Sequence, residues 1–269
     1  MLVTLRLLIA AGPLIVFLSI RHGTRSALAQ VGGAWREGLV FGLINGVIPF
    51  TLISWGEKHI DSGIAAIANA SVPIFVTLLA IRFRPSERAR GLKLVGIVLG
   101  IAGVGVLAGV HPEGGWWSVA GTLAVVAASV SYAAGGLYGQ HTVGRIPGPV
   151  VATASMLFGG LVLLPFALLQ LPSHFPGWKA VGSLLALSLA GTAFAQLVLF
   201  RVLALYGAAR LSLVTYLLPV TALIYGALIL DEPLRVSALG GLGLILGGVA
   251  LGAGVWRGVR RPIAAQPAK

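Results

Sequence analysis

The sequence predicts an all-α membrane protein with nine transmembrane helices. Of its 269 residues, 57% are hydrophobic and only 10% are charged, against about 25% in an ordinary soluble domain. The mean hydropathy is +0.97. Such a chain has too little charge to coat a soluble globule and is too apolar to stay disordered. Apolar runs of about 20 residues, the length that crosses a bilayer, recur along the whole chain.

The apolar runs define the predicted elements in chain order. They are residues 2–20, 38–55, 63–81, 91–110, 117–138, 148–171, 180–200, 210–230 and 237–256. Charged or Gly- and Pro-rich breaks such as Arg82–Lys93 and Asp231-Glu232-Pro233 separate them. The connections are short, so no soluble domain fits between the spans. A signal-peptide cleavage site could be imitated by Ala27-Leu28-Ala29. Arg21 and Arg25 lie between the first apolar run and that site, and because positive charge there resists translocation, a retained first span is favoured.

The distribution of Lys and Arg predicts the orientation of the spans. Alternate loops and the C-terminal tail carry fifteen of these residues, whereas the other loops carry three, Lys58, Lys179 and Arg235. Because basic loops stay in the cytoplasm, we expect the fifteen-charge side to be cytoplasmic. The predicted location is therefore the cell inner membrane, with multiple passes and the C-terminus inside.

Several classes of protein and site are excluded. The chain has no cysteine, which removes disulfides, zinc ribbons and cysteine nucleophiles. Its basic residues are scattered singly between apolar runs, unlike a nucleic-acid interface, despite the net charge of +12. No nucleotide-binding loop, catalytic motif or metal-ligand spacing of the five histidines is found. We therefore expect no enzyme activity, no metal and no cofactor. All seven acidic residues fall at span ends or in loops, which argues against proton coupling by a carboxylate.

An internal repeat joins the two halves of the chain. A shift of 145 residues superposes Glu87 on Glu232 and Gly103 on Gly248, and a shift of 146 superposes Pro73 on Pro219. By the charge count, the Glu87 turn faces the cytoplasm and the Glu232 turn faces outside. The copies are thus predicted to be inverted, the architecture of transporters with a site at the repeat interface.

These residues resemble a known family. One stretch is Trp55-Gly56-Glu57-Lys58-His59-Ile60-Asp61-Ser62-Gly63, with Asn69 and Pro73. The other is Tyr206-Gly207-Ala208-Ala209-Arg210, with Pro219 and Asp231-Glu232-Pro233-Leu234. Both are similar to EamA-type permeases of the drug/metabolite transporter superfamily. The resemblance implies two repeats of five spans. Here residues 1–110 hold four spans and 116–256 hold five, followed by a basic tail, 257–269. Because span 2–20 resembles the family's second, we expect the native gene to begin upstream and to encode one more span.

Candidate substrate-binding residues are short, polar and mid-span. Pro49, Pro73 and Pro219 each leave the carbonyl four residues earlier without its helical partner, at Asn45, Asn69 and Thr215. Such sites are tolerated where they face protein or a water-filled cavity, and a kink satisfied by a neighbouring helix is the alternative. Helical spacing adds further candidates to the cavity lining: Ser129 and Tyr132, Thr192 and Gln196, and Tyr216.

Two further features of the spans are the cation at Arg6 and the glycines of the fourth and ninth spans. Arg6 could extend to the outer headgroups or lie deeper and meet an anionic substrate, and both readings stay open. The glycines of the fourth and ninth spans, among them Gly96, Gly100, Gly103, Gly247 and Gly248, are spaced for close helix packing.

The sequence thus predicts a permease that moves a small organic solute by alternating access through a central cavity. Efflux of amino acids or other metabolites is what the resemblance implies. The alternatives are a membrane scaffold or accessory subunit that does not transport, and a lipid or isoprenoid flippase. The expected partners are the solute and the lipid bilayer, not nucleic acid. The oligomeric state stays open, a homodimer included.

Overall fold

The computed structural model describes most of the chain as helix. The described residues are 1–83, 92–109, 115–169, 171, 174–211, 221, 224–225, 227–228 and 236–252. The helices of the first half are α1 (Leu2–His22), α2 (Thr24–Gly33), α3 (Trp35–Gly42), η1 (Leu43–Val47), α4 (Ile48–Gly56), α5 (Ser62–Asn69), α6 (Val72–Phe83) and α7 (Leu92–Gly109). Those of the second half are α8 (Gly115–Val143), α9 (Gly148–Leu168), α10 (Trp178–Ser188), η4 (Leu189–Phe194), α11 (Ala195–Leu211) and α13 (Val236–Gly252).

Six helical segments are long and apolar enough to cross a membrane. They are Leu2–His22, Trp35–Gly56, Ser62–Ala80, Gly115–Val143, Gly148–Leu168 and Trp178–Gly207. They coincide with six of the nine predicted spans. The shorter apolar helices Leu94–Val104 and Leu239–Gly248 fall within two more. The predicted span 210–230 lies almost wholly outside the described residues, so the count of nine stays a prediction.

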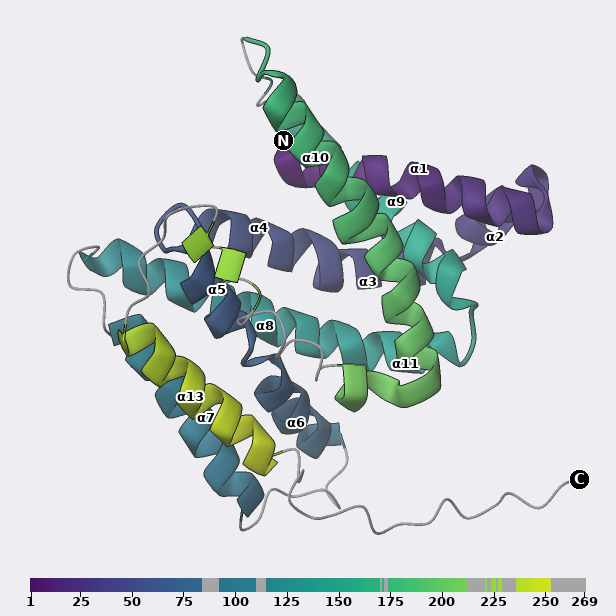
Figure 1. Cartoon of the computed structure of the whole chain (residues 1–269). Coiled ribbons are helices and arrows are strands. Elements are labelled where there is room, and N and C mark those ends of the chain that lie inside the picture. The colour runs from purple at the N-terminus through teal and green to yellow at the C-terminus, as the bar shows by residue number, and fades with distance from the viewer. Residues whose placement is uncertain are drawn as a thin grey trace, which may run out of the picture.

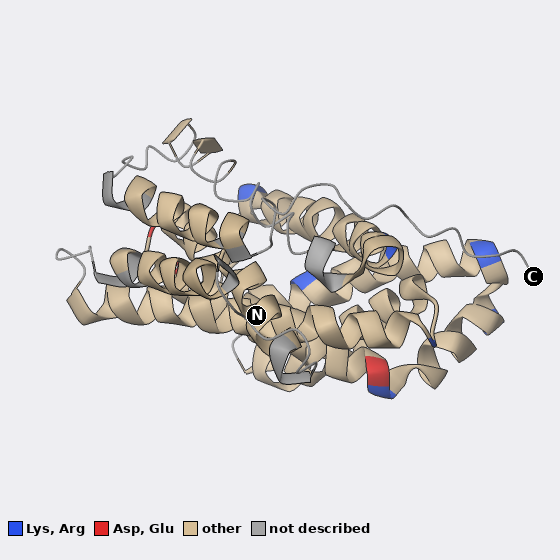
Figure 2. Ribbon diagram, turned by 90° about the horizontal axis from the view of Figure 1, so that it is seen from below, with Lys and Arg blue, Asp and Glu red and all other residues tan. Residues whose placement is uncertain are grey.

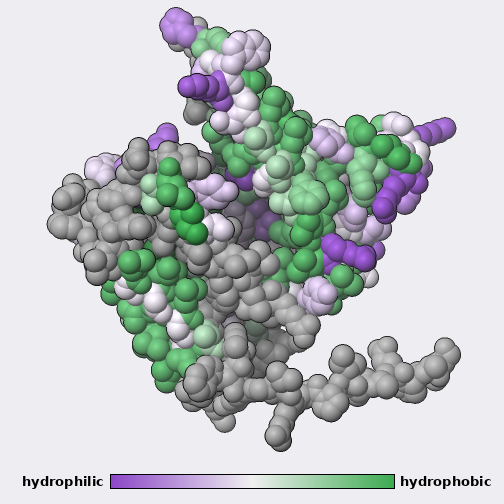
Figure 3. Space-filling model, in the orientation of Figure 1, coloured by the Kyte–Doolittle hydropathy of each residue, from purple (hydrophilic) through white to green (hydrophobic). Residues whose placement is uncertain are grey.

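Large apolar side chains cover the outside of these helices, as lipid contact requires. Val16, Ile20, Val98, Phe166 and Phe194 are all more than half exposed, which a soluble monomer would not tolerate over so wide an area. Hydrophobic side chains accordingly dominate the surface of α10, α11 and α13 in Figure 3. The charged residues, by contrast, are few, and the basic ones gather mainly toward one end of the helices (Figure 2). The protein is therefore a multi-pass membrane protein.

Five hydrophobic clusters hold the described helices together, and two of them show how the halves of the chain are joined. The larger cluster lies between α1, α3, α9 and α11 and includes Leu7, Phe41, Met156 and Phe200, and the rings of Phe41 and Phe200 are 5.0 Å apart. A second cluster joins α5, α6, α7 and α13 through isoleucines. In Figure 1 the helices α7 and α13 run side by side at one edge, while α1, α9, α10 and α11 form the opposite side.

Glycine allows α7 and α13 to approach closely, as the sequence predicts. A Cβ placed on Gly248 would lie 2.5 Å from the carbonyl oxygen of Gly96 and 2.5 Å from the amide nitrogen of Gly100. These backbones are therefore in direct contact. Gly247 makes no such approach, since a Cβ there would meet no atom within 4 Å. The packing role is confirmed for Gly96, Gly100, Gly103 and Gly248 and is wrong for Gly243 and Gly247.

Among the described residues, connections of like parity along the chain lie together at two places. At one end, Ser118 at the start of α8 donates a hydrogen bond to the carbonyl of His59, in the turn after α4. At the other end, Arg21 near the end of α1, Pro147 before α9 and Arg201 in α11 line one cavity. We refer to the latter as the basic end.

Candidate functional site

Polar side chains buried between the helices meet across the boundary between the two halves of the chain. Side-chain hydrogen bonds that join a residue before position 110 to one after position 115 include Arg6 to Thr192, Ser129 to Asn69, and Ser131 to the carbonyl of Ile44. We call these residues, with Asn45, Tyr132 and Gln196, the polar interface. Helices α1, η1, α5, α8, η4 and α11 supply them.

Arg6 reaches from α1 to η4 and does not extend outward along α1. Its Nε donates a hydrogen bond of 2.7 Å to Oγ1 of Thr192, and its guanidinium carbon lies 3.8 Å from the centre of the Phe50 ring. Thr192 is only 1% exposed, and its hydroxyl donates to the carbonyl of Leu187. Since that hydroxyl has one proton, it is fixed as the acceptor for Arg6. Packing of α1 against η4 thus selects the deeper of the two positions that the sequence left open.

Asn69 lies where the third span is interrupted. Helix α5 ends at Asn69 and α6 begins at Val72, with a turn at Ala70 and Ser71 between them. Oγ of Ser129 lies 3.1 Å from the carbonyl oxygen of Val125 in its own helix, 3.2 Å from Oδ1 of Asn69 and 3.4 Å from the carbonyl oxygen of Ala68, and its one proton is shared among these acceptors. Ser71 donates to the same Ala68 carbonyl at 2.6 Å.

The interruption differs from the simple proline kink that the spacing predicts. The carbonyl that receives these side-chain hydrogen bonds belongs to Ala68, one residue before Asn69. Pro73 is the second residue of α6 and is buried, so it begins a new helix and does not bend a continuous one.

Asn45 lies in a π-helical turn. In η1 the amide of Ile48 bonds the carbonyl of Leu43, five residues back. Asn45 is 5% exposed and packs on Gly135 of α8, where a Cβ would lie 3.0 Å from both the Cβ and the Oδ1 of Asn45. Pro49, which lacks an amide proton, follows directly in α4, and the wider turn accommodates that missing donor.

The second half has a matching turn. The π-helix η4 begins 146 residues after η1, which is the shift that superposes Pro73 on Pro219. It holds Thr192 and leads into α11, as η1 leads into α4. π-Helical turns are rare and often occur at functional sites. Their equivalent positions bring two irregular backbone segments into the polar interface.

Gln196 and Tyr132 complete this interface. Gln196 is 5% exposed, and its Oε1 has no hydrogen-bond donor among the described residues. It lies one turn after Thr192, so both side chains are on the same side of the helix. Tyr132 is half-buried against the larger hydrophobic cluster. An acceptor without a partner in an apolar interior is costly unless a ligand or water supplies a donor.

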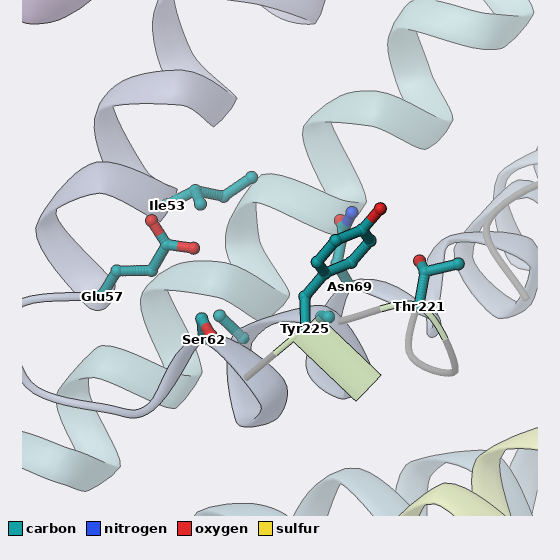
Figure 4. Close-up of a pocket in the computed structure, with 8 residues that line it drawn as sticks. Ile53, Glu57, Ser62, Asn69, Thr221 and Tyr225 are labelled. Atoms are coloured by element: carbon teal, nitrogen blue, oxygen red, sulfur yellow. The ribbon is translucent and has the colours of Figure 1, made fainter. Parts of the chain in front are cut away.

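A cavity of about 280 Å³ opens beside Asn69 on the side away from the basic end. Its polar lining residues are Glu57, Ser62, Asn69, Thr221 and Tyr225. Figure 4 shows the Tyr225 ring between Glu57 and Thr221, with the Asn69 amide behind it. An amide, hydroxyl groups and one carboxylate therefore converge on a space large enough for a small solute.

The structure brings together most, but not all, of the predicted site residues. Asn45, Asn69, Ser129, Tyr132, Thr192 and Gln196 lie in or along the polar interface. Thr215, Tyr216 and Pro219 lie outside the described residues. Phe50, which contacts Arg6, and Ser131, which belongs to this interface, were not selected from the sequence. A signal for Ser131 existed, since it directly precedes Tyr132, which was selected.

The comparisons with known proteins decide the family. The profile of the EamA-like transporter family matches residues 1–109 and 119–253. The chain belongs to the EamA-like transporter family. This assignment confirms the resemblance on which the sequence argument rested. It makes the protein a membrane transporter by family.

Three relatives illustrate the similarity. "Uncharacterized transporter YoaV" of Bacillus subtilis is 27% identical over 248 residues, which cover 91% of this chain and 84% of that protein. A Salmonella typhimurium protein named "Probable amino-acid metabolite efflux pump" is 27% identical over 210 residues, covering 74% and 69% of the two chains. A crystal structure superposes with a TM-score of 0.65 at 22% identity and covers 95% of this chain and 87% of the other, which shows a shared fold.

Proposed function

We propose that this EamA-family transporter moves a small organic solute, such as an amino acid or a related metabolite, across the inner membrane by alternating access through the polar interface. The observation that carries this proposal is the set of hydrogen bonds between the halves, Arg6 to Thr192, Ser129 to Asn69 and Ser131 to Ile44. Polar groups inside a bilayer face protein or a water-filled cavity. A line of them between two repeats is the arrangement of a transport site.

The strength of these contacts suits a site that opens and closes. Hydrogen bonds between membrane helices average only about 0.6 kcal/mol. A polar solute can therefore replace them at little cost. The Oε1 of Gln196, which has no donor among the described residues, and the donors of Arg6 offer such a solute both an acceptor and a cation.

The repeat division 1–110 and 116–256 supports the mechanism. Inverted repeats give two equivalent ways of closing the cavity, one to each side of the membrane. The matching π-helices η1 and η4 favour this division, because rare turns at equivalent positions suggest equivalent roles. Efflux is the direction we propose, since the name of the Salmonella typhimurium relative describes it for that protein.

A thermal-shift screen followed by transport in proteoliposomes tests the proposal. A solute that binds the folded protein at 100 times its dissociation constant stabilises it by about 2.7 kcal/mol. We expect one class among amino acids, nucleosides and organic cations to raise the melting temperature and to exchange across the membrane. Stabilisation without flux would favour a scaffold or accessory subunit, and flux of fluorescent lipid alone would favour a flippase.

A further inference from the structure

A second, larger cavity of about 600 Å³ lies at the basic end, away from the polar interface. Three elements form its walls: the last turns of α1, the start of α9 and the middle of α11. Its basic lining residues are Arg21, His22 and Arg201, and its twelve lining residues include no Asp or Glu. Pockets that hold drug-sized molecules have volumes of about 300–1,000 Å³. The cavity is thus large enough for a lipid headgroup with its glycerol.

The lining changes from apolar to basic along the helices. On α1, Phe17 and Leu18 lie one turn before Arg21 and His22, which are exposed near the helix end. On α11, Leu197 lies one turn before Arg201. Both helices run toward the basic end, so the apolar wall lies deeper in the bilayer and the charges lie at its surface. A molecule with an anionic head and an apolar tail matches this order.

The start of α9 places the positive end of a helix dipole beside the cavity, which Gly148 and Pro149 line. Pro149 has no N–H, and the amides of Val150 and Val151 bond the Pro147 carbonyl, so this end contributes its dipole rather than a set of free amides. The guanidinium of Arg21 lies 4.7 Å from the centre of the Phe17 ring, which holds it at the edge of the cavity. A phosphate here would meet two guanidinium groups, which are among its strongest partners, beside a helix dipole of favourable sign.

We propose that this cavity binds the phosphate of an anionic phospholipid, with Arg21 and Arg201 holding the headgroup and Phe17, Leu18 and Leu197 contacting an acyl chain. Basic pockets between transmembrane helices on the cytoplasmic side suit such headgroups. A bound lipid would tie α1 to α9 and α11, and would stabilise this end of the protein without entering the transport cavity. The site does not depend on which solute is carried.

The melting temperature of the full chain in neutral detergent tests this site, with phosphatidylglycerol, phosphatidylcholine or inorganic phosphate added. We expect phosphatidylglycerol to stabilise the protein and phosphatidylcholine to have a much smaller effect. Inorganic phosphate should have little effect, since it lacks the acyl chain. Stabilisation by phosphate equal to that by phosphatidylglycerol would contradict a lipid site.

Substitutions separate this site from general charge attraction. Arg21→Gln and Arg201→Gln should each weaken phosphatidylglycerol binding about fivefold, since each basic group near a membrane surface contributes by about that factor. Arg25→Gln is the matched control, because Arg25 is exposed on α2 beside the same end and does not line the cavity. Equal losses in Arg25→Gln, or an unchanged phosphatidylglycerol effect in the double variant, would overturn the proposal. Arg21→Lys with Arg201→Lys gives a second test, because it keeps the charge and should retain part of the binding.

Discussion

Asn69 is the side chain on which the transport proposal depends most. It lies at the interruption between α5 and α6, bonds Ser129 of the other half and lines the cavity of about 280 Å³. The sequence predicted its position from its spacing to Pro73. The break itself could not be predicted, because it depends on hydrogen bonds from Ser71 and Ser129 to the Ala68 carbonyl, and Ser129 lies far away in the chain.

Replacing Asn69 by Leu should impair transport much more than folding. The change makes the span more apolar, so insertion should be unharmed, and one lost interhelical hydrogen bond costs about 0.6 kcal/mol. A solute group left without its partner costs about 1–3 kcal/mol, or roughly five- to a hundredfold in affinity. Transport in vesicles with matched protein levels measures this. Ser155→Ala is the control, since Ser155 is fully buried and its hydroxyl bonds the Ala152 carbonyl in its own helix, and normal transport by Asn69→Leu would make Asn69 structural.

Thr192 is the acceptor that fixes Arg6. In Thr192→Val the guanidinium keeps its charge but loses that acceptor, so the cost exceeds that of an average interhelical hydrogen bond, and we expect the free energy of unfolding to fall by about 1–3 kcal/mol. Thr153→Val is the matched control, because the buried Thr153 hydroxyl bonds the carbonyl of Pro149 in its own helix. Unfolding in denaturing detergent compares the two variants. Equal effects would mean that the Arg6 contact contributes nothing specific.

At the scale of elements, the packing of α7 on α13 follows from the glycine pattern. Gly248→Ala should destabilise the protein by about 1–3 kcal/mol, because the added Cβ would meet the backbone of α7 at 2.5 Å. Gly247→Ala has open space and should be neutral or stabilising by up to about 1 kcal/mol. Melting temperatures of the purified variants separate these outcomes. A reversed order would show that α13 packs through another face.

Most helices could be predicted from hydropathy alone, whereas their irregularities could not. Continuous apolar runs predict α1, α8 and α9 because a bilayer requires helices with every backbone group bonded. The π-helices η1 and η4 interrupt equally apolar runs. Pro49 hints at η1, but η4 has no proline and depends on the Thr192 hydroxyl bonding the Leu187 carbonyl. Arg6 was visible in the sequence, and only the packing of α1 on η4 shows where its side chain lies.

For the molecule as a whole, the charge asymmetry predicts a cytoplasmic C-terminus. By the predicted spans, fifteen Lys and Arg residues fall in one set of alternate loops and the C-terminal tail, and three fall in the other set of loops. A reporter fused after Lys269 that works only in the cytoplasm should therefore be active. A reporter fused after a truncation at Lys58 should be inactive, because that loop belongs to the other side. Activity in the opposite pattern would reverse the orientation and the proposed leaflet of the lipid site.

The central claim is that the polar interface is an aqueous path for solute, and thiol accessibility tests it most directly. The chain has no cysteine, so a single introduced thiol can be labelled without background. In proteoliposomes, a polar, membrane-impermeant thiol reagent should label Asn69→Cys, and a transported solute should slow that labelling. Leu161→Cys is the control, since Leu161 is 44% exposed on the outside of α9, where lipid would surround it. Labelling of Asn69→Cys that is no faster than that of Leu161→Cys, or that solute does not change, would contradict the account.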